Sequence, residues 1–111
     1  MRKKARWPLA TVKKLVGDGR VAVTHSACDL FPSRTDALVT VCAAIERLRA
    51  ADFAHRSQLA VHEADVYGVR LDDRGWYLKL TVVEDRGQLV LMISFHPLEE
   101  PLRTRGGMVE P

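Results

Sequence analysis

Histidine is the residue type in this 111-residue chain best suited to move protons near neutral pH. The four histidines are His25, His55, His62 and His96. Two near-neutral groups and a cation are the minimum for breaking a ribose–phosphate link. One group takes the proton of the 2′-hydroxyl, the other protonates the leaving 5′-oxygen, and the cation stabilises the developing charge. The histidine spacings match no local metal-ligand pair, so we expect no metal and no cofactor, and a metal-dependent hydrolase is the weakest alternative.

The stretch from Gly75 to Pro97 contains two runs of β-branched and aromatic residues, which predict a β-hairpin. A two-residue loop, Arg86-Gly87, keeps the alternating apolar residues of both strands on one face. A three-residue loop would instead pair Leu80 with Met92 and mix the faces, so the two-residue loop is favoured. The expected core set is Leu78, Leu80, Val82, Leu89, Leu91, Ile93 and Phe95.

The opposite face of this hairpin is the candidate active site. In the favoured register Tyr77 lies opposite His96, and Lys79 lies opposite Ser94. A phenol, an ammonium and an imidazole then share one polar face. Arg56 and Arg70 are further candidates, with Lys79, for binding the charge of a substrate.

The elements that must position these groups change in type along the chain. Helical spacing of apolar residues predicts helices over about 9–19, 24–30 and 33–52, the last capped by Ser33 with Asp36. Extended patterns over 53–61 and 65–71 then precede the hairpin. We therefore predict an α+β domain with three N-terminal helices packed on one face of a mainly antiparallel four-stranded sheet. The domain spans 9–96, between a basic arm at 1–8 and a flexible tail at 97–111.

The formal net charge is +3, and the first twenty residues hold seven of the basic side chains. This asymmetry suits a polyanionic partner such as RNA, although a solvated basic helix face explains it equally well. No apolar run approaches the roughly 18 residues of a membrane span, and no apolar segment follows the basic start. We expect a cytoplasmic protein in which Cys28 and Cys42 are free thiols.

Five segments resemble, in order and spacing, the MqsR family of type II toxins, whose fold is related to that of the RelE ribonucleases. They are VKKLVGDGRVAVTHSA, AADF, DVYGVRL, WYLKLTVVED and VLMISFH. The resemblance covers about residues 9–96. It implies a metal-independent endoribonuclease that cuts single-stranded mRNA, and a cognate antitoxin protein encoded beside it.

The family's functional positions are only partly kept. Its tyrosine falls on Tyr77, but its two functional lysines fall on His55 and His96, and a functional glutamine falls on Ala64, which cannot make a polar side-chain contact. The resemblance and the residues together predict His55, Tyr77 and His96 as catalytic. The alternative is a non-catalytic module of the same fold that binds nucleic acid or a protein.

Overall fold

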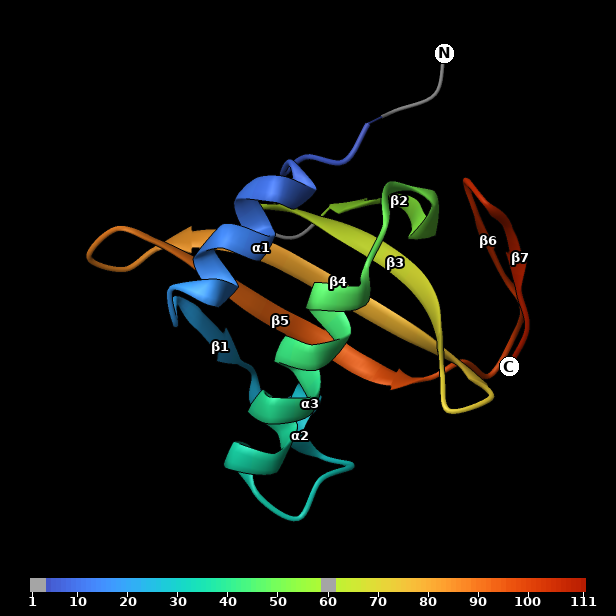
Figure 1. Ribbon diagram of the computed structural model, residues 1–111, viewed down its shortest axis with the longest axis horizontal. Coiled ribbons are helices and arrows are strands. Elements are labelled where there is room, and N and C mark those ends of the chain that lie inside the picture. The colour runs from blue at the N-terminus through green and yellow to red at the C-terminus, as the bar shows by residue number, and fades with distance from the viewer. Residues whose placement is uncertain (1–3, 59–61) are drawn as a thin grey trace.

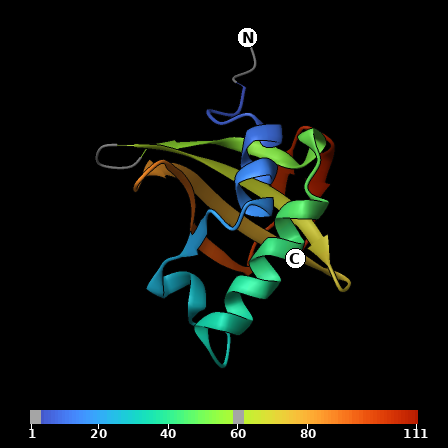
Figure 2. The ribbon, with the colours of Figure 1, turned by 60° about the vertical axis from the view of Figure 1, so that its left-hand side comes forward.

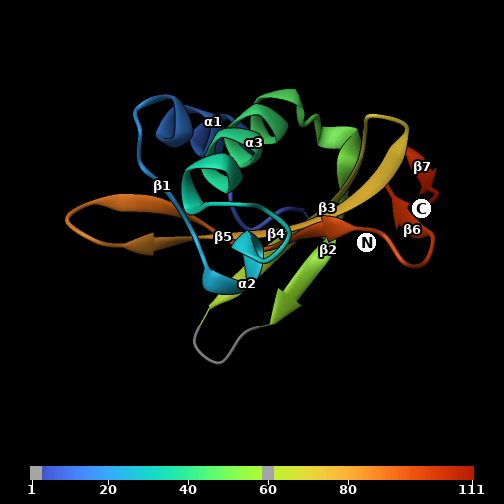
Figure 3. The same ribbon diagram turned by 90° about the horizontal axis from the view of Figure 1, so that it is seen from below.

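The computed structural model describes residues 4–58 and 62–111, and it shows a mixed α+β fold. Two helices, α1 (Leu9–Gly17) and α3 (Arg34–Arg47), cover one face of a sheet (Figures 1 and 2). The short helix α2 (His25–Cys28) lies beside the sheet, level with the strands, rather than over it (Figure 3). No helix in the described part of the chain has the length and apolar character to span a bilayer.

The main sheet has five strands in the order β1-β5-β4-β3-β2. They are β1 (Val21–Val23), β2 (Phe53–Gln58), β3 (Glu63–Leu71), β4 (Arg74–Glu84) and β5 (Gln88–Pro97). The predicted α+β class is confirmed, whereas the prediction of four strands was wrong. The sequence does not predict the fifth strand, β1, because its three residues are too few to show a periodic pattern. It pairs in parallel with β5, and the other neighbours are antiparallel.

The third helix begins as the sequence predicts, because the Ser33 hydroxyl accepts a hydrogen bond from the Asp36 backbone N–H at 3.1 Å. Its inner face buries Val41 and Ile45 completely. It ends at Arg47 rather than continuing to residue 52, and a separate 3-10 turn, Ala50–Asp52, leads into β2. The predicted first strand reached residue 61, and its last part lies outside the described residues.

The loop of the β4–β5 hairpin differs from the one that the sequence favours. Glu84 pairs with Gln88 across a three-residue loop, in which Arg86 has φ 56° and Gly87 has φ 108°. The Arg20 side chain donates hydrogen bonds to the carbonyls of Asp85, Gly87 and Gln88. This long-range support, from a residue just before β1, is the physical reason for the wider loop and is invisible in the local pattern.

A β-bulge then restores the expected register farther from the loop. Leu80 pairs with Met92 but Lys79 pairs with Ser94, so Ile93 is the extra residue. Val90 and Met92 are buried in place of the predicted Leu89, Leu91 and Ile93, while Phe95 is buried as predicted. Beyond the bulge, Tyr77 pairs with His96 and Lys79 pairs with Ser94, as the sequence predicts.

The expected flexible tail is instead a β-hairpin, β6 (Leu102–Thr104) and β7 (Gly107–Val109), packed beside β2 and β3 (Figure 1). Two glycines of the sheet make room for this segment. A Cβ on Gly68 would lie 2.8 Å from a Leu102 methyl, and one on Gly75 would lie 2.1 Å from the Glu110 carbonyl oxygen. The packed unit therefore extends beyond residue 96.

Candidate active site on the open sheet face

The side of the sheet away from α1 and α3, called here the open face, carries Tyr77 and His96 directly opposite each other. Their rings stack with centroids 5.0 Å apart and an angle of 9° between the planes. Leu78 and Phe95, the next pair along, point the other way into the core. The predicted neighbours are therefore brought together, because the bulge lies on the loop side of them.

His96 is held in a form that suits proton transfer. Its Nδ1 lies 2.8 Å from the Pro97 carbonyl oxygen. Because a carbonyl can only accept, Nδ1 must carry the proton, and the neutral ring then has its lone pair on Nε2. The side chain is exposed, so Nε2 is accessible to a substrate.

Tyr77 contributes a phenol to this site. Partial burial raises the pKa of its phenol above the usual value, which keeps the group neutral at cellular pH. A neutral phenol can donate its proton to a phosphate oxygen or a leaving oxygen.

Lys79 lies two residues from Tyr77 on the same strand and therefore on the same face, roughly 7 Å farther along. It pairs with Ser94 on one side and Val66 on the other. Its ammonium can thus serve a phosphate bound over the Tyr77–His96 pair. Ser94, a polar neighbour, lies opposite Lys79 as the sequence predicts, although the sequence assigns it no role.

His55 is on the open face but not beside His96. It lies on the edge strand β2, opposite Val66, whereas His96 lies on β5. The two strands are three spacings apart, or about 14 Å. The two imidazoles therefore do not flank one phosphate, which the predicted pair of proton-transfer groups requires.

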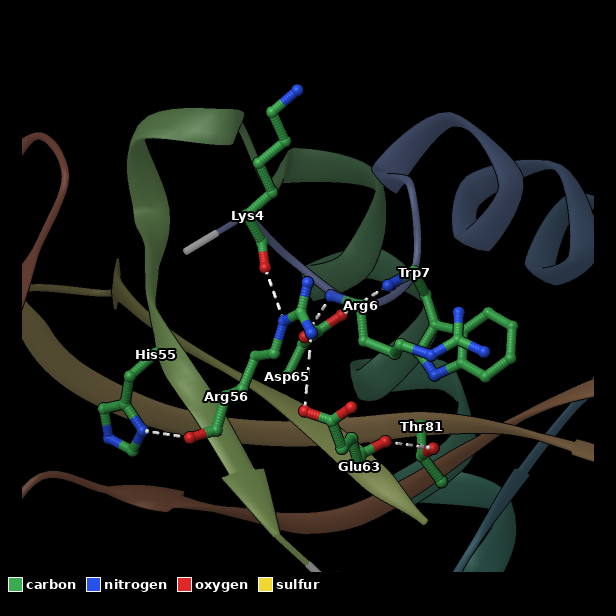
Figure 4. A network of polar contacts seen from close by, with 8 residues as sticks. All are labelled: Lys4, Arg6, Trp7, His55, Arg56, Glu63, Asp65 and Thr81. Carbon is green, nitrogen blue, oxygen red and sulfur yellow. Dashed lines mark hydrogen bonds and ion pairs between the residues drawn. The ribbon is translucent and has the colours of Figure 1, made fainter. Parts of the chain in front are cut away.

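Arg56 faces the helix side of the sheet, opposite to its neighbour His55 (Figure 4). Its guanidinium donates to the Lys4 carbonyl oxygen at 2.7 Å and to a Glu63 carboxylate oxygen at 3.4 Å. This cation therefore anchors the N-terminal arm rather than facing the Tyr77–His96 pair.

Asp65 completes this anchor beside Arg56 (Figure 4). Its carboxylate accepts the backbone N–H groups of Arg6 and Trp7 at 2.7 and 2.9 Å. The residue is fully buried, and desolvation raises the pKa of the carboxyl although both hydrogen bonds act to lower it. The basic arm is thus fastened to the sheet from residue 4 onward.

The other positions singled out in the sequence contribute little to the open-face pair. Arg70 ends β3 and donates to the Asp73 carbonyl oxygen at 2.9 Å, within the adjacent turn. Ala64 is completely buried, so it offers no polar contact in place of the family's glutamine. Within the described ranges no group of three or more histidine, cysteine or acidic residues lies close enough to hold a metal.

Comparison with known proteins gives no assignment: no family model matches the chain, and no curated protein matches its sequence.

Proposed function

We propose that this chain is a metal-independent endoribonuclease that cleaves single-stranded mRNA, acting as the toxin of a cytoplasmic toxin–antitoxin pair of the MqsR type. The observation that carries the proposal is the stacked Tyr77–His96 pair, with the His96 side chain exposed and Lys79 on the same face. A stacked aromatic pair with a nearby ammonium suits a nucleotide, whose base can stack and whose phosphate needs a cation.

In the proposed reaction the ribose 2′-oxygen attacks phosphorus and the bond to the 5′-oxygen breaks. Nε2 of His96 takes the 2′-hydroxyl proton, and Lys79 stabilises the negative phosphorane. The Tyr77 phenol, far more acidic than the leaving alkoxide, gives its proton to the 5′-oxygen. The His96 imidazolium then returns a proton to Tyr77 through solvent. The products are a 2′,3′-cyclic phosphate and a 5′-hydroxyl.

His55 has a different part in this proposal from the one that the sequence predicts. At about 14 Å from His96 it cannot act on the same phosphate. It is proposed to contact the RNA strand elsewhere, so His55→Ala should raise KM and leave kcat nearly unchanged.

The test is cleavage of a mixed-sequence single-stranded RNA in the presence of a chelator. His96→Ala and Tyr77→Phe should each slow cleavage about 10²–10⁴-fold, the usual worth of a general base or a general acid. His25→Ala, an exposed histidine on α2, is the matched control and should cut like the unaltered protein. Full activity in His96→Ala would overturn the assignment.

A binding module without catalysis is the second candidate, favoured by the separation of the two histidines and by buried Ala64. It predicts that the protein retards RNA in a gel but leaves it intact over hours, with no effect on growth when expressed. The toxin proposal predicts instead growth arrest, relieved by an adjacently encoded antitoxin.

A further inference from the structure

A groove with a volume of about 590 Å³ lies between β2 and the β6–β7 hairpin, away from the Tyr77–His96 pair. Its lining includes three arginines, Arg56, Arg103 and Arg105, together with His55. No acidic residue is among the described residues that line it. An opening with several cations and no carboxylate has the charge expected of an anion-binding site.

Of the arginines that line the groove, Arg103 is the one whose guanidinium the described residues leave exposed to a ligand. The Arg56 guanidinium is engaged by Lys4 and Glu63 on the other side of β2. Arg103 is exposed, and its side chain makes no hydrogen bond or ion pair to the part of the chain that the structure describes. The Arg105 guanidinium lies 5.1 Å from the centre of the Phe53 ring.

The backbone of the hairpin that carries these arginines is fixed to the rest of the fold by hydrogen bonds and is not a loose tail. The Arg105 N–H donates to the Phe53 carbonyl at 2.9 Å, and the Gly106 N–H donates to the Ala51 carbonyl at 2.8 Å. The Thr104 hydroxyl closes the turn on the Gly107 carbonyl at 2.7 Å. Fixed groups lose less conformational entropy on binding an anion than mobile ones do.

His55 forms the opposite wall of the groove. Its Nδ1 lies 3.0 Å from the Arg56 carbonyl oxygen, which requires the proton on Nδ1 and leaves Nε2 for a ligand. His55 is also on the same face as Lys79, because both residues pair with Val66 on β3, the strand that lies between them. The groove therefore continues the open face toward the sheet edge.

We propose that this groove is a phosphate-binding subsite for single-stranded RNA, in which Arg103 binds the backbone of the strand that is cut at Tyr77 and His96. The inference rests on the proposed endoribonuclease function. A guanidinium can donate two parallel hydrogen bonds to the oxygens of one phosphate. A ribose–phosphate strand is long enough to lie in the groove and still reach Tyr77 and His96. An acidic peptide is the alternative occupant.

The test separates this subsite from catalysis by using 2′-O-methyl RNA of mixed sequence, which has no 2′-hydroxyl and cannot be cleaved by transesterification. Affinity is measured by fluorescence anisotropy between 50 and 300 mM salt. Arg103→Ala should weaken binding about 3–10-fold and reduce the slope of log K against log salt by about one. Arg47→Ala, which removes an exposed arginine of α3, should change neither quantity.

The outcomes distinguish the two claims. If Arg103→Ala binds 2′-O-methyl RNA with unchanged affinity and slope while unmodified RNA is still cut, the subsite is refuted and the nuclease stands. If Arg103 matters for binding but no RNA is ever cut, the subsite stands and the nuclease fails. Binding of poly-glutamate that depends on Arg103, with RNA binding unaffected, would assign the groove to an acidic protein partner instead.

Discussion

On the helix side of the sheet Asp65 and Glu63 face Arg56, whereas on the open side Tyr77, Lys79 and His96 lie together and form no ion pair with a carboxylate in the described part of the chain. The first group uses its charges on one another and on the N-terminal arm. The second keeps a proton-transfer nitrogen and an ammonium for a ligand. Under the proposed function, similar residue types serve stability on one face and chemistry on the other. Substitutions should separate the two roles.

The largest expected effect on stability is at Asp65. Asp65→Ala leaves two backbone N–H groups of the arm without their acceptor, which should lower the free energy of unfolding by about 2–4 kcal/mol. Denaturant unfolding measures this loss. Asp36→Ala, which removes an exposed carboxylate that accepts the Ser33 hydroxyl hydrogen bond, is the matched control and should cost less than about 1 kcal/mol. Equal losses at both positions would contradict the anchoring role.

The pH dependence of this anchor has a defined sign. Burial raises the pKa of the Asp65 carboxyl in the folded protein, so folding takes up a proton in the window between the unfolded and folded pKa values. The contribution of Asp65 to stability is therefore largest below the unfolded pKa and falls as pH rises through the folded one. Relative to Asp65→Asn, the unaltered protein should gain stability on mild acidification.

A smaller loss is expected at Gly75, where the C-terminal segment meets the sheet. Gly75→Ala places a Cβ against the Glu110 backbone, which must move, at a cost of about 1–3 kcal/mol. Amide exchange at Arg105 and Gly106 should quicken as the hairpin loosens. Gly17→Ala meets nothing within 4 Å and should leave that exchange unchanged. Protection preserved in Gly75→Ala would show that the hairpin does not depend on this contact.

Local patterns predict much of this fold because local forces decide it. The Ser33 cap and the stripe of α3 depend on neighbours in sequence, and so does the pairing of Tyr77 with His96 within one hairpin. The wider loop was not predictable, since it depends on Arg20, more than sixty residues away. The C-terminal hairpin was missed because its pairing is short and relies on glycines of other strands.

The candidate site divides in the same way. The sequence groups His55 with His96 through a family resemblance, but resemblance gives no distance between two strands, and the strand order separates them. Nothing in the alternation of β2 shows whether Arg56 or His55 faces the open side, because the bulge beside Ala54 resets the alternation after Phe53. In the sequence, the feature that points to the groove is the pair Arg103 and Arg105. They lie in a tail with no periodic apolar pattern, so no strand was predicted there.

The smallest stability effect completes the comparison of the two faces. Tyr77 stacks on exposed His96, and its hydroxyl makes no hydrogen bond to the described residues, so Tyr77→Phe, which keeps the ring, should change the free energy of unfolding by less than about 0.5 kcal/mol. The same substitution should slow RNA cleavage about 10²–10⁴-fold, because the proton that the leaving oxygen needs is lost. Denaturant unfolding and cleavage assays on one preparation give both values. A loss of stability as large as that of Asp65→Ala would make Tyr77 a structural residue, and the open face would then lack the proton donor that distinguishes it from the helix side.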